Sequence, residues 1–283
     1  MLNFTESFLI QTQGGKMKSI TKLIVAAAAV SSAVLYGAEV INYSAKDGMK
    51  NIFGKKVTFK ENSVVCQGQS ILAGKKIIEI DPAKKYTLKL TAVGNAEKST
   101  VLYAGFSMLD DKGRTTVAHN WQGYPGTLTE VAADAKKGDT VIKVKDGSKW
   151  NKSAINVIAA NAKADLSDIP NRNIVADNIV SSKKVGDVWE LTLKKPLRAA
   201  LPAGTLIRQH YRGGYLYISA GRTVPVNGTL EIKGTISGVS SKLESFSRKH
   251  FPVNAQKAQL VILADWTGKK ADVEIKDVTI TVE

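Results

Sequence analysis

Alternation of apolar and polar residues is the feature that most restricts how this chain can fold. Along 86–92, Tyr86, Leu88, Leu90 and Ala92 alternate with threonine and lysine. A period of two places successive side chains on opposite faces of a strand, so this pattern is typical of half-buried β-strands. Beyond the first 38 residues, no segment keeps a helical period for more than two or three turns. We therefore expect an all-β protein.

The alternation changes phase near the end of the chain. Val273 and Ile275 share one phase, whereas Val278, Ile280 and Val282 follow the other. One extra residue in a strand shifts the phase in this way, and that is the definition of a β-bulge. The sequence therefore predicts a bulge at 276–277 within a continuous last strand.

Turn residues separate the remaining strand candidates. Asp-Pro, Gly-Asn, Asp-Lys-Gly, Asn-Gly and Thr-Gly segments all punctuate the alternating runs. The other predicted strands are 57–60, 77–80, 101–108, 215–220 and 259–264.

The middle of the chain has its own series of turns and strands. Residues 125–210 contain three segments in which a glycine-centred turn leads into a short strand, and Trp150 and Trp189 are expected in a core of their own. The flanks, 39–124 and 211–283, hold 86 and 73 residues, a suitable size for one β-sandwich. We therefore predict a β-sandwich interrupted by a small inserted β subdomain.

The first 38 residues read as a leader that precedes the folded part. Met17 opens a basic stretch that is followed by the apolar run 23–30 and by small residues up to Ala38. This order is that of a secretory signal peptide, and the run is too short for a confident membrane span. We predict translation from Met17, cleavage after Ala38, and export to the periplasm, cell surface or medium without stable membrane insertion. An extended leader and cleavage after Ala33 stay open as alternatives.

Charge and cysteine content limit the partners and the compartment. Without its leader the chain has 37 basic and 24 acidic residues, a net charge of +13. Such an excess favours an anionic partner, although it also serves solubility. Export and the lack of a recognition motif argue against nucleic acid. The single cysteine, Cys66, forms no internal disulfide and is expected to be a small buried hydrophobe.

Two segments of the flanks carry a family resemblance. The run 77–88, IIEIDPAKKYTL, and the ending 258–280, which contains VEIKDVTI, resemble strand pairs of carbohydrate-binding modules with the galactose-binding-like jelly-roll fold, found beside xylanases and glucanases. The resemblance implies a jelly-roll sandwich and a glycan ligand. The insert more faintly resembles small β units of phage-tail and surface-adhesion proteins.

We expect no cofactor, and a structural calcium ion stays open as the alternative that the same resemblance implies. In the resembling modules an acidic residue near the N-terminus and the closing aspartates often hold it. Here Glu39 and Asp277 could contribute, but Lys276 occupies the first closing position. Because calcium requires six to eight oxygen ligands, a lysine ammonium beside the site opposes its binding.

Aromatic and polar side chains gather where the insert leaves and rejoins the sandwich. Aromatic rings stack on sugar rings, while amides and charged groups bind hydroxyls. A narrow connection would bring the two segments together, so they are expected either to contact a ligand or to pack the joint. Trp266, on a late loop, is a further candidate or a turn residue. The candidate ligand contacts are His119, Asn120, Trp121, Tyr124, His210, Tyr211, Arg212 and Trp266.

Signals of catalysis are weak. The three histidines lack metal-binding spacing, and no Gly-x-Ser-x-Gly motif is present. Residues 209–212 supply the residue types of a jelly-roll polysaccharide lyase, but the strand motifs of the resembling alginate lyases are absent.

The sequence therefore predicts an exported, non-catalytic protein that binds a polysaccharide, with its lysines favouring an acidic one. A structural or adhesive surface protein that binds another protein is one alternative, and a polysaccharide lyase is another.

Overall fold

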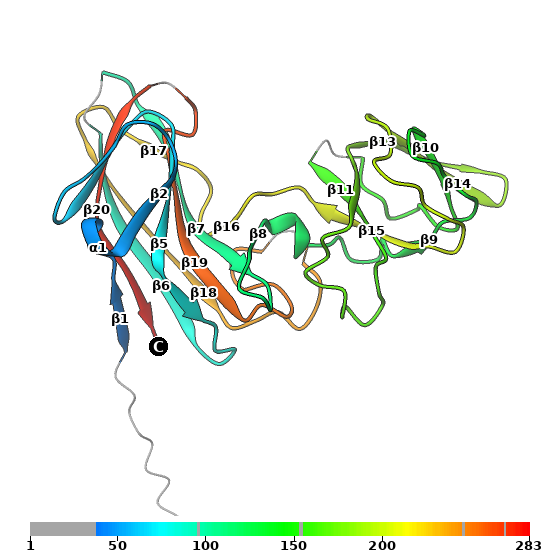
Figure 1. Cartoon of the computed structure of the whole chain (residues 1–283), viewed down its shortest axis with the longest axis horizontal. Coiled ribbons are helices and arrows are strands. Elements are labelled where there is room, and N and C mark those ends of the chain that lie inside the picture. Colours follow the sequence, from blue (N-terminus) through cyan, green and yellow to red (C-terminus); the bar gives the residue numbers. More distant parts are fainter. Residues whose placement is uncertain (1–37, 95–96, 153–154, 245–246, 269) are drawn as a thin grey trace, which may run out of the picture. The chain divides into compact units, whose positions relative to one another are not determined.

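Two antiparallel sheets pack face to face and enclose the larger apolar core (Figure 1). The computed structural model describes residues 38–94, 97–152, 155–244, 247–268 and 270–283. The predicted start at Met17 and the signal peptide lie, apart from Ala38, outside the described residues. The structure confirms the all-β prediction.

The first sheet has six strands and contains the last strand of the chain. Its order is β18–β6–β20–β4–β3, and β1 also pairs with β20. The bounds are β1 (Glu39–Asn42), β3 (Val57–Phe59), β4 (Ser63–Gln67), β6 (Lys85–Gly94), β18 (Thr229–Ser237) and β20 (Asp272–Val282).

The second sheet has seven strands and carries a long tyrosine-rich outer face. Its order is β16–β7–β19–β5–β2, and β17 and β8 also pair with β7. The bounds are β2 (Met49–Phe53), β5 (Ser70–Glu79), β7 (Thr100–Leu109), β8 (Thr115–Thr116), β16 (Leu216–Tyr217), β17 (Arg222–Val224) and β19 (Lys257–Ala264). Short helical turns are α1 (Ala45–Gly48) and η1 (Ala118–Asn120).

Alternation in the sequence accounts for the sandwich core. In β6, Tyr86, Leu88, Leu90 and Ala92 are all buried, whereas the residues between them are more accessible. β20 shifts its register against β6 between Lys276 and Thr279, and Asp277 has a positive φ of 53°. The predicted bulge is therefore confirmed, and it allows both phases of β20 to face the core. Cys66 is buried there, as expected.

Two strand predictions needed correction. The predicted strand 77–80 is the end of the ten-residue β5, whose earlier part was missed because Gly74 and two lysines interrupt the pattern. Conversely, 215–220 forms only the two-residue β16. Tyr215 and residues 218–220 are irregular chain, and Ile218 turns into the sandwich core.

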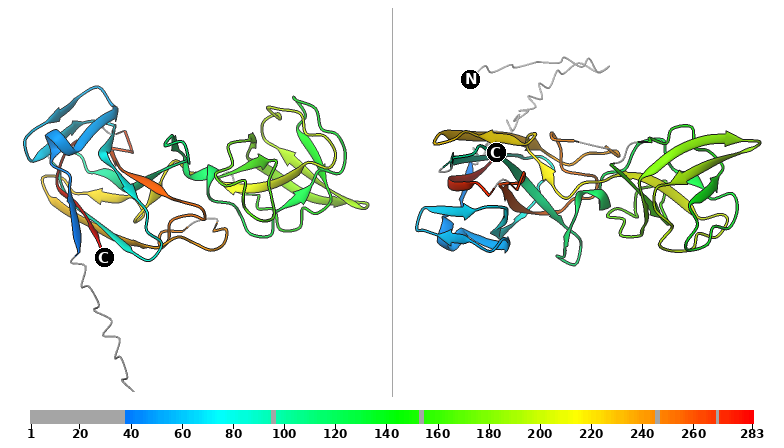
Figure 2. Two further views of the ribbon diagram at one scale, coloured as in Figure 1. Left: turned by 60° about the horizontal axis from the view of Figure 1, so that its bottom comes forward. Right: turned by 90° about the horizontal axis from the view of Figure 1, so that it is seen from above.

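The strands between residues 125 and 210 form two smaller sheets, grouped together in both views of Figure 2. One has the order β10–β14–β13 and the other β12–β11–β15–β9. The bounds are β9 (Thr129–Glu130), β10 (Val141–Val144), β11 (Asn156–Ala160), β12 (Ile174–Asp177), β13 (Ile179–Val185), β14 (Val188–Leu193) and β15 (Leu206–Tyr211).

These smaller sheets enclose a second apolar core. Trp150 is buried in it and Trp189 packs against it, which confirms the prediction for both tryptophans. One loop of this region contributes elsewhere: Ile169 belongs to the sandwich core, and Leu166 packs against it. Residues 37–283 accordingly form one compact unit. No helix among the described residues is long and apolar enough to span a membrane.

Candidate functional site

The insert leaves and rejoins the sandwich through two paired segments, 119–124 and 209–215, which we call the neck. The Tyr211 backbone N–H donates to the Gln122 carbonyl at 2.8 Å, and the Tyr124 N–H donates to the Gln209 carbonyl at 2.8 Å. His119 and Gly213 are joined by a further backbone hydrogen bond of 3.2 Å. The two segments therefore meet, as the sequence predicted for a narrow connection.

Three of the candidate ligand contacts lie away from solvent. Trp121 is 2% exposed and belongs to the sandwich core, and its indole N–H donates to the Thr116 hydroxyl. Asn120 is buried and donates to the Asn171 carbonyl at 2.8 Å. His210 is fully buried. As ligand contacts at the neck these three are corrected to packing residues, because His210 and Asn120 are bonded across the joint. Trp121 packs in the core and reaches solvent only where a small part of its surface lines the junction cleft described below.

A buried polar network fixes the protonation of His210. Its Nε2 accepts from Arg208 Nε at 3.0 Å, and its Nδ1 donates to the His119 carbonyl at 2.7 Å. An arginine can only donate and a carbonyl can only accept, so His210 is neutral with its proton on Nδ1. Burial, reinforced by the Arg208 charge, lowers the pKa of His210 to about 4. Arg208 is balanced by Asp168 at 2.6 Å.

This network also bears on the lyase alternative. Gln209 is fully buried, and its side-chain amide is bonded to the backbone N–H and carbonyl of Asn151 at 2.8 and 2.6 Å. Since His210 is buried and neutral as well, neither residue reaches a substrate. The side chains of Gln209 and His210 instead fix the C-terminal end of β15.

The accessible aromatic residues of the neck continue onto the seven-stranded sheet. Burial raises the pKa of Tyr124, and nearby Tyr211 adds to the rise. Burial likewise raises the pKa of Tyr217, to which three neighbouring phenols contribute: Tyr215, Tyr103 and Tyr211. Ring contacts join Tyr103, Tyr215 and Tyr217, and Tyr211 lies near enough to affect both Tyr217 and Tyr124; we call these five of the eight tyrosines the tyrosine row. The row consists of Tyr103, Tyr124, Tyr211, Tyr215 and Tyr217.

Strand pairing explains how the row is built. Tyr217 of β16 lies opposite Gly105 of β7, which brings its ring to 4.9 Å from the ring of Tyr103 between centroids. The Tyr215 and Tyr217 centroids are 6.2 Å apart. Position 105 must be glycine, because a Cβ there would collide with the Leu216 carbonyl oxygen. The neighbouring residues Leu216 and Phe106 face the core, so the tyrosines face outward.

A small hollow of about 120 Å³ lies beside the row. Tyr215 lines one side of it, together with Ser107, Thr116 and Gln259. Gln259 is buried and donates to the Gly74 carbonyl at 2.6 Å, which leaves its own carbonyl as an acceptor. The outer face of this sheet thus combines aromatic rings with amide and hydroxyl groups.

The other candidate contacts are more accessible. His119 is half-buried, and burial lowers its pKa below the ordinary value. Arg212 is exposed. Trp266 is 40% exposed on the loop after β19, where its backbone N–H donates to the Val101 carbonyl at 2.9 Å. That bond places Trp266 near the start of β7 rather than at the neck.

The two residues considered for calcium do not come together. Glu39 pairs with Val282, five residues along β20 from Asp277, which is a separation of about 16 Å along a strand. Glu39 instead forms an ion pair with Lys76 at 3.1 Å. Among the described residues, no group of three or more histidine, cysteine or acidic side chains is placed to hold a metal ion. The Glu39–Asp277 pairing is therefore corrected.

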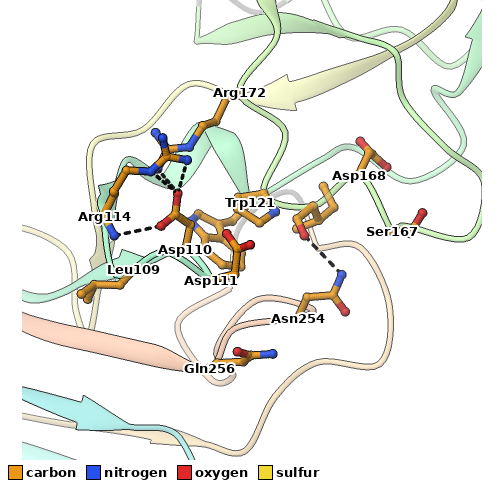
Figure 3. A pocket seen from close by; sticks show the side chains of 12 residues that line it. Leu109, Asp110, Asp111, Arg114, Trp121, Ser167, Asp168, Arg172, Asn254 and Gln256 are labelled. Carbon is orange, nitrogen blue, oxygen red and sulfur yellow. Dashed lines mark hydrogen bonds and ion pairs between the residues drawn. The ribbon is translucent and has the colours of Figure 1, made fainter.

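A second concave feature, the junction cleft, lies between three loops (Figure 3). It has a volume of about 370 Å³. One wall is the turn after β7, the second is the insert loop 167–172, and the third is the segment before β19. Its lining is Leu109, Asp110, Asp111, Arg114, Trp121, Ser167, Asp168, Ile169, Pro170, Arg172, Asn254 and Gln256.

Asp110 is the central charge of this cleft. Its carboxylate forms ion pairs with the guanidinium groups of Arg114 and Arg172, at 2.7 Å each. It also accepts a hydrogen bond from the Arg114 backbone N–H at 2.8 Å. Burial would raise the pKa of Asp110, but hydrogen bonds from both arginines hold it far below the usual range. The ion pair with Arg172 joins the sandwich to the insert. Asn254 adds a hydrogen bond of 3.0 Å to the Leu166 carbonyl.

Sequence reasoning missed several of these residues. The Tyr-x-Tyr spacing at 215–217 was the available signal for the row, since residues two apart in a strand share a face. Nothing local links them to Tyr103, which is more than a hundred positions earlier. The Asp-Lys-Gly segment 111–113 forms the turn that the sequence predicts, but the pairing of Asp110 with Arg172 depends on the tertiary fold.

Comparison with known proteins adds little. No family model matches the chain, and no curated protein matches it. Among solved structures, one chain of a structure of infectious bursal disease virus, Gt strain, aligns with a TM-score of 0.13 and 9% identity. The alignment covers 98% of this chain and 45% of the viral one, so this chain spans less than half of that chain's length. A likeness this low carries no argument about fold or function.

Proposed function

We propose that this chain is an exported, non-catalytic carbohydrate-binding protein that holds a polysaccharide along the tyrosine row. The observation that carries the proposal is the gathering of five of the eight tyrosines, all of them partly exposed, into one neighbourhood. Tyrosine combines an apolar ring face with a hydroxyl at its edge, so it suits a ligand that has both C–H faces and hydroxyl groups.

The arrangement of the row favours an extended ligand. Its members come from β7, from β16 and from both segments of the neck, so their rings are distributed over a surface instead of closing around one pocket. A chain of linked sugar rings offers repeated faces to such a surface. The hollow beside Tyr215 supplies hydroxyl and amide partners for the same chain.

The proposed scaffold is a jelly roll. The antiparallel sandwich and the closing strand β20, paired with both β6 and β1, are compatible with that topology. Net positive charge favours acidic glycans, since it raises the local concentration of polyanions at low salt. Exposed Arg212 follows Tyr211 in the chain and would supply a positive charge to such a glycan.

Affinity electrophoresis tests the proposal. The protein without its leader is run through gels that contain alginate, polygalacturonate, xylan or a mixed-linkage β-glucan. We expect retardation by at least one gel, stronger for the acidic polymers and weaker as salt rises. No retardation by any of the four would end the proposal.

Variants of the row identify the surface. Tyr215→Ala and Tyr124→Ala remove one ring each and should weaken binding about tenfold, or about 1.4 kcal/mol. Tyr215→Phe keeps the ring and is the matched control, for which we expect near-normal retardation. Equal loss in the alanine and phenylalanine variants would point to hydroxyl contacts instead of stacking. Capture of another protein with no response to polysaccharide would favour the adhesive alternative.

A further inference from the structure

The junction cleft contains polar groups that the fold leaves uncommitted. Among the described residues, no hydrogen bond or ion pair involves the side chain of Asp111 or of Gln256. Both are exposed, and both line the cleft. Asn254 uses its amide nitrogen on two backbone carbonyls, at 3.0 and 3.4 Å, which leaves its oxygen as an acceptor. Figure 3 shows Asn254 and Gln256 on one side of the cleft and Asp110, with its two arginines, on the other.

The floor of the cleft is apolar and rigid. Trp121 and Ile169 both line it and both belong to the sandwich core. Pro170 completes this part of the lining. A ligand with one apolar face and a rim of hydroxyl groups would match a cleft with an apolar floor and polar walls.

The charges of the cleft select against ionic ligands. Arg114 and Arg172 are both engaged by Asp110, and Asp168 is engaged by Arg208. Asp111 is the remaining acidic side chain of the lining, so its three carboxylates balance the two lining arginines together with Arg208, which pairs with Asp168 from outside the lining. A divalent cation would find one uncommitted carboxylate, which is too few for its oxygen shell. An anion would meet Asp111, which repels it, and two arginines whose charges are already shared with Asp110, so the balanced cleft has no net positive charge to hold it.

From these features we infer that the junction cleft is a second binding site, specific for one neutral pyranose unit. The Asp111 carboxylate and the amides of Asn254 and Gln256 bind its hydroxyl groups, and the free donors of Arg172 reach its rim. Because the walls come from the sandwich and the insert together, the insert is required for this site. The inference rests on the proposed function, because it names the class of sugar unit that the same protein would bind in addition to the polysaccharide on the tyrosine row.

Titration with simple glycosides tests the inference on the whole protein without its leader. Methyl glucoside, methyl galactoside and methyl mannoside are the neutral probes, and sodium glucuronate is the anionic one. Saturation-transfer NMR and calorimetry measure binding. We expect at least one neutral glycoside to saturate a single site and to bind at least tenfold more tightly than glucuronate.

The variant Asp111→Ala/Gln256→Ala should weaken that binding at least tenfold. Both side chains are exposed, so the fold is expected to be retained. The matched control is Asp187→Ala/Gln69→Ala, which changes the same residue types at exposed positions outside the cleft. We expect no change from the control. The inference is overturned if no neutral glycoside binds, if the cleft variant binds normally, or if glucuronate binds best.

Failure here is distinguishable from failure of the proposed function. If the glycosides do not bind but polysaccharide retardation persists and depends on Tyr215, only the cleft inference is lost. If the glycosides bind through Asp111 and Gln256 while Tyr215→Ala leaves retardation intact, the tyrosine row is the part that fails.

Discussion

In and around the neck lie two sets of side chains that differ in what surrounds them. The buried set is Asn120, Trp121, Arg208, Gln209 and His210. The accessible set comprises the tyrosine row, His119 and Arg212. Both sets are rich in the aromatic and polar residues that mark sugar-binding proteins. Composition alone therefore does not separate a ligand surface from a packed joint.

Hydrogen bonding explains the division. Every polar side chain of the buried set is bonded to the opposite segment, to the insert loop 163–171 or to Asn151, so its hydrogen-bonding capacity is used within the protein. Burial of such groups is tolerated only when they are bonded in this way. Changes in the buried set should therefore alter stability, and changes in the accessible set should alter binding. The predictions below test that separation.

The largest effect is expected for Trp121→Ala. Removing a fully packed tryptophan leaves a cavity and removes the hydrogen bond from its indole N–H to the Thr116 hydroxyl, at a cost of about 3–5 kcal/mol in the free energy of unfolding. Urea unfolding followed by circular dichroism measures it. Trp121→Phe, which keeps most of the ring, should lose less than the alanine variant. If Trp121→Ala were as stable as the wild type but had lost polysaccharide binding, Trp121 would belong to the ligand-binding residues. The division into a buried and an accessible set would then be wrong.

A pH effect of about 3 kcal/mol is expected from His210. Its folded pKa of about 4 lies below the ordinary value of 6.5, so the unfolded state binds more protons between these values. Stability is therefore full above about pH 6.5 and falls as the pH drops toward 4. Urea midpoints measured from pH 7.5 to 4.5 follow this loss.

Variants assign that loss to one histidine. His210→Gln removes the titrating group, so its stability, although lower at neutral pH, should depend less on pH over this range. His250→Gln is the control, since His250 is half-exposed beside Glu244. We expect the control to keep the wild-type pH dependence. An unchanged slope in His210→Gln would show that other groups carry the effect.

A smaller effect is expected from Arg172→Ala, which removes the ion pair between insert and sandwich. Arg114 still neutralises Asp110, and Arg172 is 40% exposed, so solvent screens the pair. We expect the melting temperature to fall by roughly 2 °C at low salt, and by less in 1 M NaCl. Arg198→Ala removes a pair with Asp177 inside the insert and is the matched control for glycoside binding. Weaker glycoside binding in Arg172→Ala alone would support a role of this arginine in the cleft.

The smallest effect is expected outside both sets, at the bulge of β20. Asp277 has a φ of 53°, a conformation that favours glycine, so Asp277→Gly should raise stability by less than about 1 kcal/mol. Thr279→Gly, in extended backbone two residues later, should instead lower it by about 0.5–1 kcal/mol. Thermal unfolding resolves the opposite signs. Equal losses in both variants would mean that the Asp277 side chain stabilises the bulge.

Much of the fold follows from local pattern. The period of two predicted the strands of the sandwich. It also predicted the bulge, because one extra residue moves every later side chain to the opposite face of the strand. The sequence also indicated that the two segments of the neck meet. The early part of β5 was missed because Gly74, Lys75 and Lys76 interrupt the apolar–polar alternation. Pairing of β5 with β2 and β19 keeps these residues in the strand.

The site was less predictable because exposure depends on distant contacts. Trp121 and Tyr124 are three residues apart, and only the fold decides that one packs into the core and the other lies near solvent. Likewise, the junction cleft needs Asp110, Arg172 and Gln256, which no sequence motif connects. Buried partners such as Asp168 and Arg208 are recognisable only when their pairing is seen.

The pairing of β1 with β20 has a mechanical consequence. Glu39 is the register partner of Val282, so the first and last strands begin and end at the same edge. Tension applied through these two ends would separate the strands one hydrogen bond at a time, as a zipper opens, and would not load the whole ladder in shear. The insert lies outside that path of force. A surface tether at either end would therefore peel β1 away at low load while the tyrosine row and the cleft kept their shape.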